Sequence, residues 1–261
     1  PLTERSSGFV NVASEAGTSL ARRVSGADLM RLRSQSRVLP HAAINEELEV
    51  RIEEYRERMG EDPSGREKRR LKAEVRDNLL PKSMLKSDRI WGYFDLSEKV
   101  LGIDAAQESA AERFLRRLQA SIDTVNFKPL EFEQPVHDFL NRVFLGGAPT
   151  EFAVGRECRM QDASDAASIV RWSNFDLSDR SIRDHVANGM RLTHLAVVYD
   201  NMMSFVLGEN GVISKVKFLG MDDDAEDHGD ALAELDAEFV LMTGTLRRML
   251  GDLRKVLGDF V

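Results

Sequence analysis

Two consecutive helical patterns constrain this fold most, because neither has an apolar face wide enough for the centre of a core. The first begins near Asn45, and its apolar residues recur at intervals of three and four: Leu48, Ile52, Tyr55 and Met59. Asn45 is a suitable N-cap, and the acidic residues that follow it suit the positive end of the helix dipole. A second helix is expected from about Arg66 to Leu80, with Pro81 ending it and a narrow stripe of Leu71, Val75 and Leu79. Because residues 60–65 form a turn between them, the sequence predicts a helical hairpin that projects from the body.

The rest of the chain alternates short strand patterns with helical ones. Strands are expected at 27–33, 90–95, 100–104, 152–154, 168–172, 191–199, 204–207 and 212–218, and Asn210-Gly211 is a strong hairpin turn. Helices are expected at 106–122 and 136–145, from Ser178 as N-cap to Gly189, and finally to about Leu257. The last helix has a long apolar stripe from Leu232, which makes it a candidate for both core and interface. The class is therefore α+β, with mostly antiparallel sheets, packed helices and a projecting helical hairpin.

These patterns divide the chain into four expected regions. They are an N-terminal strand region, a projecting basic hairpin, a central α+β region, and an antiparallel sheet with the long helix: 1–44, 45–89, 90–150 and 151–261. Because the chain starts at Pro1, we expect the true N-terminus, and with it a first strand, to lie upstream. No apolar run approaches the ~20 residues that span a bilayer, so no membrane partner is expected. The single cysteine, Cys158, excludes an intramolecular disulfide and fits a reducing compartment.

The two signs of charge are segregated along the chain. The net charge is −8, which by itself argues against nucleic acid. However, residues 66–89 hold nine Lys or Arg against four Asp or Glu, whereas residues 221–238 hold nine acids and no Lys or Arg. A local basic patch creates its own field regardless of the total. The charge pattern therefore favours an anionic partner for the predicted hairpin.

No catalytic motif accompanies this patch. The sequence has no phosphate-binding loop, nucleophile elbow, zinc-protease motif or dinucleotide fingerprint, and its five histidines have no metal-ligand spacing. Cys158 between Arg156 and Arg159 lacks a partner that would make it a nucleophile. A calcium loop starting at Asp224 fails because position 12 is Leu235, so the acidic run is better explained as a solvated loop before the last helix. We therefore expect a protein that is not an enzyme and has no cofactor.

The basic hairpin supports three interpretations. A solvated helix face with pairs such as Arg70–Glu74 would need no partner. Against that interpretation, six cations fall within eleven residues, and the charge continues past Pro81 beside apolar Met84 and Leu85 at the expected tip. Sequence-independent contact with DNA phosphates fits this pattern, and docking of an acidic protein partner is the alternative. The candidate DNA-binding residues are Arg66, Lys68, Arg69, Arg70, Lys72, Arg76, Lys82 and Lys86.

Three stretches of this sequence resemble the bacterial recombination-associated RdgC family. The first is Arg37-Val-Leu-Pro40 with the basic helix that ends Asn78-Leu-Leu-Pro-Lys82. The second spans Asn188-Gly189, Leu195-Ala196 and Val212-Ile-Ser-Lys-Val-Lys-Phe218. The third, which is the most specific, is Asp236-Ala-Glu-Phe-Val-Leu-Met-Thr-Gly244. Order and spacing match over almost the whole chain, without the family's N-terminal strand region.

The resemblance implies a function that the residues alone do not show. It implies a ring-shaped homodimer whose hole accepts double-stranded DNA with little sequence preference, and which restrains a RecA-type recombinase in the bacterial cytoplasm, at the nucleoid. Lys215 and Lys217 match cationic positions of the family and are added to the DNA-binding candidates. At the tip the family can carry an aromatic residue where this chain has Met84. Ser173-Asn174-Phe175 replaces a Lys/Gln-rich stretch, so no DNA contact is expected there.

Overall fold

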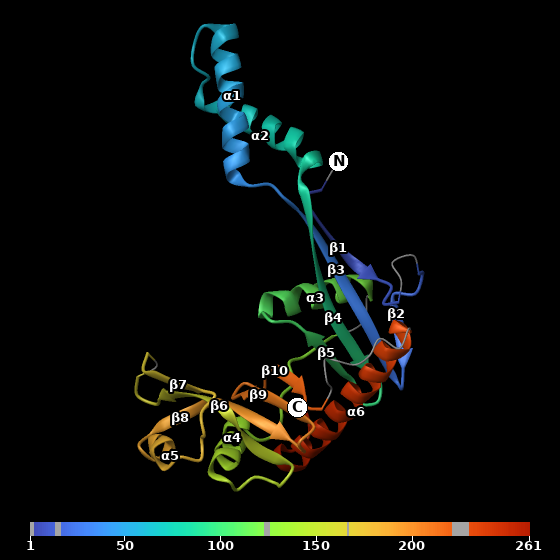
Figure 1. The fold of residues 1–261 in the computed structure, drawn as a ribbon, viewed down its shortest axis with the longest axis vertical. Coiled ribbons are helices and arrows are strands. Elements are labelled where there is room, and N and C mark those ends of the chain that lie inside the picture. Colours follow the sequence, from blue (N-terminus) through green and yellow to red (C-terminus); the bar gives the residue numbers. More distant parts are fainter. Residues whose placement is uncertain (1–2, 14–16, 123–125, 166, 221–229) are drawn as a thin grey trace. The chain divides into compact units, whose positions relative to one another are not determined.

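Two compact units make up this protein, residues 1–124 and 125–261. The structure is a computed structural model that describes residues 3–13, 17–122, 126–165, 167–220 and 230–261. Each unit holds one five-stranded sheet, all of whose neighbouring strands are antiparallel, together with packed helices (Figure 1). The predicted α+β class with antiparallel sheets is confirmed. The ring-shaped dimer and the finer division into four regions stay predictions.

The first unit is built on one long strand pair. Strands β3 and β4 run antiparallel from Ala27 opposite Asp95 to Val38 opposite Met84. Strand β5 pairs with β4, while β1 and β2 pair with successive halves of β3. The strands are β1 (Arg5–Val10), β2 (Ala21–Val24), β3 (Ala27–Val38), β4 (Met84–Asp95) and β5 (Val100–Asp104).

The predicted helical hairpin is confirmed, and it is inserted between β3 and β4. It consists of α1 (His41–Met59), α2 (Gly65–Leu79) and the short 3-10 turn η1 (Leu80–Lys82). Figure 1 shows it continuing past one end of the β3–β4 pair. Ile44 and Tyr55 of α1 and Leu71 and Val75 of α2 are buried where the two helices pack. The narrow stripe read from the sequence is thus the contact between the two helices.

The predicted start of the first helix is wrong. Helix α1 begins at His41, directly after Pro40, so Asn45 lies inside the helix and no side chain caps it. A proline suits this boundary because its φ is already close to the helical value. The C-terminal end is made by Gly60 in the left-handed conformation, with φ of 73° and its N–H bonded to the Arg56 carbonyl. Met59, predicted to lie on the stripe, is exposed at that end.

Helix α3 (Glu108–Ser121) covers one face of the first sheet, close to the predicted 106–122. The buried Phe114 ring lies over Gly92 of β4, where a Cβ atom would come within 2.4 Å of a ring carbon. Phe9 of β1 meets the same ring edge-to-face at 5.2 Å between centroids. Glycine at position 92 therefore allows the close approach that anchors α3 to the sheet.

The second unit contains the predicted meander. Its strands are ordered β10-β9-β8-β6-β7: β6 (Phe152–Asp162), β7 (Ile169–Ser173), β8 (Met190–Tyr199), β9 (Met203–Gly208) and β10 (Ile213–Phe218). Gly211 has φ of 78°, as the predicted turn requires. The helices are α4 (Val136–Leu145), which has the predicted bounds, α5 (Arg180–Ala187) and α6 (Ala231–Leu257).

The predicted N-cap of α5 is wrong by one residue. Asp179 rather than Ser178 caps α5, because the Asp179 carboxylate accepts a hydrogen bond from the Ser181 N–H at 2.8 Å. Asp230 caps α6 through the N–H groups of Leu232 and Ala233. Most of the acidic run, residues 221–229, lies outside the described residues, and so does most of the calcium loop considered there.

Candidate nucleic-acid interface

Helix α2 is held in one orientation by its ends and by its apolar stripe. Ser64 and Glu67 form a capping box in which the Ser64 side chain accepts from the Glu67 N–H and the Glu67 carboxylate accepts from the Ser64 N–H. Leu71 and Val75, at 8% and 1% exposure, face α1. The six basic side chains of α2 are all exposed: Arg66, Lys68, Arg69, Arg70, Lys72 and Arg76.

Tyr55 adds a link between the two helices. Its hydroxyl donates to Glu67 Oε1 at 2.6 Å. This bond, with the two bonds from Ser64, lowers the pKa of Glu67 from 4.5 to about 2, and it raises the pKa of Tyr55. At the turn, Arg56 pairs with Glu53 at 2.9 Å and with Asp62. These contacts join the tip of the hairpin to the helix that carries the cations.

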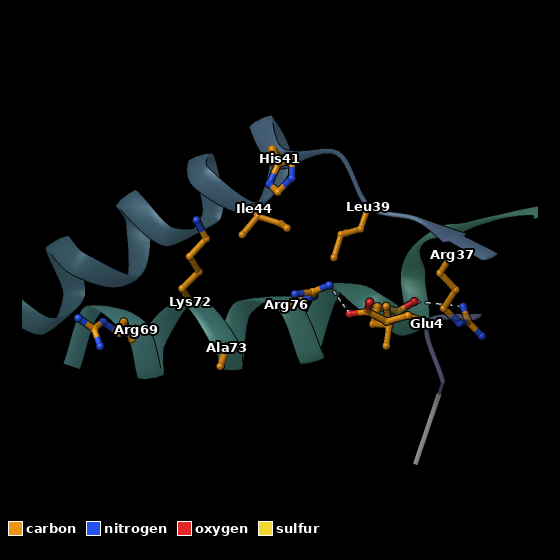
Figure 2. A pocket seen from close by; sticks show the side chains of 10 residues that line it. Glu4, Arg37, Leu39, His41, Ile44, Arg69, Lys72, Ala73 and Arg76 are labelled. Carbon is orange, nitrogen blue, oxygen red and sulfur yellow. Dashed lines mark hydrogen bonds and ion pairs between the residues drawn. The ribbon is translucent and has the colours of Figure 1, made fainter. Parts of the chain in front are cut away.

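Three of the predicted cations gather at a cleft between the hairpin and the sheet. Arg69, Lys72 and Arg76 are three and four residues apart, so they share one flank of α2. The cleft has a volume of about 380 Å³, and its other lining residues come from the segment before β1, the end of β3 with the residue after it, α1, α2 and η1: Glu4, Arg37, Leu39, His41, Ile44, Ala73 and Leu80. Figure 2 shows Lys72 extending from α2 toward α1.

The charges around the cleft do not cancel. Arg76 pairs with Glu4 at 2.5 Å, and both side chains are about half exposed. Arg37 donates to the carbonyl of Leu80 at 3.1 Å. Because a carbonyl is neutral, this bond does not compensate the charge of Arg37. Arg69 and Lys72 form no ion pair with any residue that the structure describes. One carboxylate thus faces four permanent cations, so the cleft is suited to an anionic ligand.

The other predicted cations of the hairpin lie outside the cleft. Arg66 and Arg70 are not among the residues that line it, and Arg70 pairs with Glu74 at 3.5 Å. Lys68 and Lys82 are exposed, and Lys86 lies 3.9 Å from Asp88. Because such exposed pairs are worth at most ~1 kcal/mol, they do not prevent a phosphate from competing for the cation.

The predicted position of Met84 and Leu85 at the hairpin tip is wrong. They are the first residues of β4 and pair with Val38 and Arg37, so they lie at the base of the hairpin. The tip is the turn over residues 60–65. The apolar residues after Pro81 continue a strand rather than a loop, because β3 offers them a pairing edge that is distant in sequence. Both remain exposed, at 76% and 56%.

Lys215 and Lys217 lie in the second unit on β10. Lys215 has φ of 52° in a register shift of the β9–β10 pair, and its Nζ contacts both carboxylate oxygens of Glu157 at 2.5 and 2.7 Å. Lys217 is exposed and forms no ion pair with a described residue. Of the two, only Lys215 has, among the described residues, a carboxylate partner with which another anion would have to compete.

Sequence reasoning missed Arg37 and His41. Arg37 belongs to the Arg-Val-Leu-Pro stretch, and it comes to the cleft only because β3 ends beside α2. The available signal in the sequence was a pair of basic side chains, one shortly before Pro40 and one directly after it, at the start of the first helix. Sequence reasoning also missed a second group of arginines, on α3: Arg113, Arg116 and Arg117.

The structure gives no support to Cys158 as a nucleophile. Its side chain is 1% exposed on β6, and burial, with a smaller effect of Glu157, raises the pKa of the thiol to about 12. Among the described residues, no three of His, Cys, Asp or Glu come together in a way that could hold a metal ion. Within the same residues, none of the helices combines the length and apolarity that crossing a membrane requires.

Fold and site together define a class: an α+β protein whose helical hairpin carries an excess of cations at a cleft suited to an anionic ligand. Residues 1–260 match the family described as "RdgC: Putative exonuclease, RdgC", and the chain belongs to this family. The chain is 29% identical over 253 residues to the recombination-associated protein RdgC of Stenotrophomonas maltophilia (strain R551-3). It is 32% identical over 255 residues to that of Xylella fastidiosa (strain M23) and 31% over 255 to that of Xanthomonas oryzae pv. oryzae (strain PXO99A). Each alignment covers 95% of this chain and 84% of the relative.

Proposed function

We propose that this protein is a non-catalytic double-stranded DNA-binding protein without sequence preference, which encircles DNA as a homodimer and modulates recombination by a RecA-type recombinase. The observation that carries the proposal is the cleft at the hairpin base, where Arg37, Arg69, Lys72 and Arg76 face a single carboxylate. Its cations meet phosphates, which are the same in every sequence.

Support for the recombination role comes from the relatives, which are named recombination-associated proteins. A chain of net charge −8 is attracted to DNA more strongly when its basic surfaces face the DNA and its acidic excess faces away from it. A closed dimer provides that arrangement. We place the protein accordingly at the nucleoid in the bacterial cytoplasm.

The deciding experiment compares DNA binding by a cleft variant and a control at several salt concentrations. The cleft variant is Arg69→Gln with Lys72→Gln, and the control, Lys99→Gln with Lys128→Gln, removes two exposed cations elsewhere. Each lost phosphate contact lowers the slope of log affinity against log salt by ~0.9, so we expect a fall of about 1.8 for the cleft variant and none for the control.

Unrelated duplexes of equal length should compete equally well with the bound duplex. A preferred site bound ~1000-fold more tightly would contradict the absence of sequence preference. An unchanged slope in a folded cleft variant would contradict the DNA contact and favour the alternative, docking of an acidic protein partner. Degradation of the duplex by the purified protein, abolished by a chelator, would contradict the non-catalytic assignment.

In a strand-exchange reaction, the wild-type protein should slow the recombinase, and the cleft variant should slow it less.

A further inference from the structure

A second basic surface lies in the first unit, on the face of the sheet that α3 covers. A groove of about 540 Å³ runs between β1 and α3. It is lined by four arginines and three small residues: Arg5, Arg113, Arg116, Arg117, Ser7, Ser109 and Ala120. No carboxylate and no residue of the hairpin is among these lining residues. The groove and the cleft share no lining residue, so they are distinct sites, although Glu4 of the cleft is next in sequence to Arg5 of the groove.

Two contacts hold α3 against β1, the two elements that form the groove. Phe9 of β1 packs against Phe114 of α3, and Arg117 Nε donates to Ser7 Oγ at 2.7 Å. Arg5, Ser7 and Phe9 alternate along the strand, so they point to the same face of the sheet. The position of α3 over β1 is therefore anchored at two points, and Arg5 extends the groove beyond them.

The arginines of the groove are poorly compensated. Arg116 pairs with Glu112 at 2.9 Å, but both side chains are more than half exposed, so the pair is weak. Arg5 and Arg113 form no ion pair with any residue that the structure describes, and Arg113 is only partly exposed. Bringing like charges around one hollow costs free energy, because they repel one another. An anion in the groove would remove this cost.

The shape of the groove favours an extended anion over a single one. From Ser109 to Ala120 the lining follows α3 over eleven residue-to-residue steps, or ~16 Å at 1.5 Å per step. This length equals four to five steps of a duplex at ~3.4 Å each. Guanidinium groups bind phosphate oxygens through two parallel hydrogen bonds, and the small side chains of Ser7, Ser109 and Ala120 leave room for them.

We propose that the α3 groove binds successive phosphates along the backbone of a nucleic-acid strand, as a second contact surface beside the cleft. This proposal rests on the proposed function. The chemistry of the groove points to linked phosphates, and the proposed function identifies them as the phosphates of DNA.

The test is a groove variant, Arg5→Gln with Arg113→Gln, compared with wild type and with the Lys99→Gln, Lys128→Gln control. Arg117 is left intact because it anchors α3. Binding of a random-sequence duplex is measured at several salt concentrations, and inorganic tripolyphosphate and poly-glutamate are tested separately. We expect the groove variant to bind the duplex roughly tenfold more weakly at low salt, with a slope lower by about 1.8. Its melting temperature should stay within about 2 °C of wild type, since both side chains lie outside the core.

The outcomes separate this proposal from the proposed function. If the wild type binds duplex and only the cleft variant loses slope, the groove proposal is overturned and the proposed function stands. If the wild type binds no duplex at all, both fail. Loss of tripolyphosphate binding in the groove variant with unchanged duplex binding would assign the groove to a free polyphosphate. Loss of poly-glutamate binding alone would assign it to an acidic protein. Either result would overturn the nucleic-acid assignment.

Discussion

The carboxylate of Glu67 shows how one side chain can join two helices. It accepts hydrogen bonds from Tyr55 and from Ser64, which hold its pKa at about 2, below its ordinary 4.5. Because the folded-state pKa is depressed, the stabilisation is fully present above pH 4.5 and is lost as the pH falls from about 4.5 toward 2.

We therefore expect Glu67→Gln to reduce the pH dependence of hairpin stability between about pH 4.5 and 2. Hydrogen exchange of α2 amides, measured across that range, reports the hairpin separately from the rest of the molecule. Glu74→Gln is the matched control, because Glu74 lies on the same helix with only an exposed pair to Arg70. Equal pH dependence in wild type and Glu67→Gln would contradict the role of this carboxylate.

Cys158 illustrates how burial overrides sequence neighbours. The arginines on either side of it would lower the pKa of an exposed thiol, whereas burial raises the pKa to about 12. The native protein at pH 8 should therefore react with a thiol reagent far more slowly than the same chain in denaturant, where a free thiol has a pKa of ~8.5. Equal rates in the two conditions would show that the thiol is accessible.

At the scale of elements, the apolar stripe and the cations of α2 have separate roles. Leu71 is buried against α1, whereas Arg69 and Lys72 face solvent at the cleft. A buried contact stabilises the hairpin, while an exposed cation without a partner contributes to binding and little to stability. Mutation of the stripe should therefore lower stability, whereas mutation of the cations should weaken binding and leave stability almost unchanged.

Leu71→Ala should destabilise the hairpin, by at most the ~2–5 kcal/mol of a fully buried leucine, because removal of its side chain leaves a cavity against α1. Denaturant unfolding, with hydrogen exchange of α1 and α2 as a local probe, measures the effect. Met59→Ala in the same hairpin is the control, since Met59 is 54% exposed. A Leu71→Ala protein as stable as Met59→Ala would show that α1 and α2 do not depend on this contact.

At the scale of the whole molecule, the proposed dimer needs an apolar surface, and α6 offers one. Within the stretch Asp236–Gly244, Phe239 is buried but Val240 and Leu241 are exposed, at 39% and 55%. These two neighbouring side chains are where we expect a partner helix to pack if α6 forms the dimer interface.

Leu241→Asp should shift the protein from dimer to monomer in sedimentation at micromolar concentration, because a carboxylate in an apolar interface loses its hydration. Leu145→Asp on α4 is the matched control, since Leu145 is also 55% exposed. A wild-type monomer with intact DNA binding would contradict the ring. A dimer unaffected by Leu241→Asp would place the interface on another surface.

What the sequence determined by itself is local. The helical hairpin, the bounds of α4 and the meander with its Asn210-Gly211 turn follow from periodicity and turn chemistry, which depend on residues a few positions apart. What only the tertiary structure decided depends on strand pairing between distant segments. The β3–β4 register placed Met84 and Leu85 at the base of the hairpin and brought Arg37 to Arg69 and Arg76. Likewise, packing of α3 on β1 joined Arg5 to Arg113, and the sheet of the second unit set Lys215 against Glu157. A pair four residues apart, such as Arg70–Glu74, can be read along the chain, but the partners of Arg37, Lys215 and Arg117 lie 43, 58 and 110 positions away, which no local pattern contains.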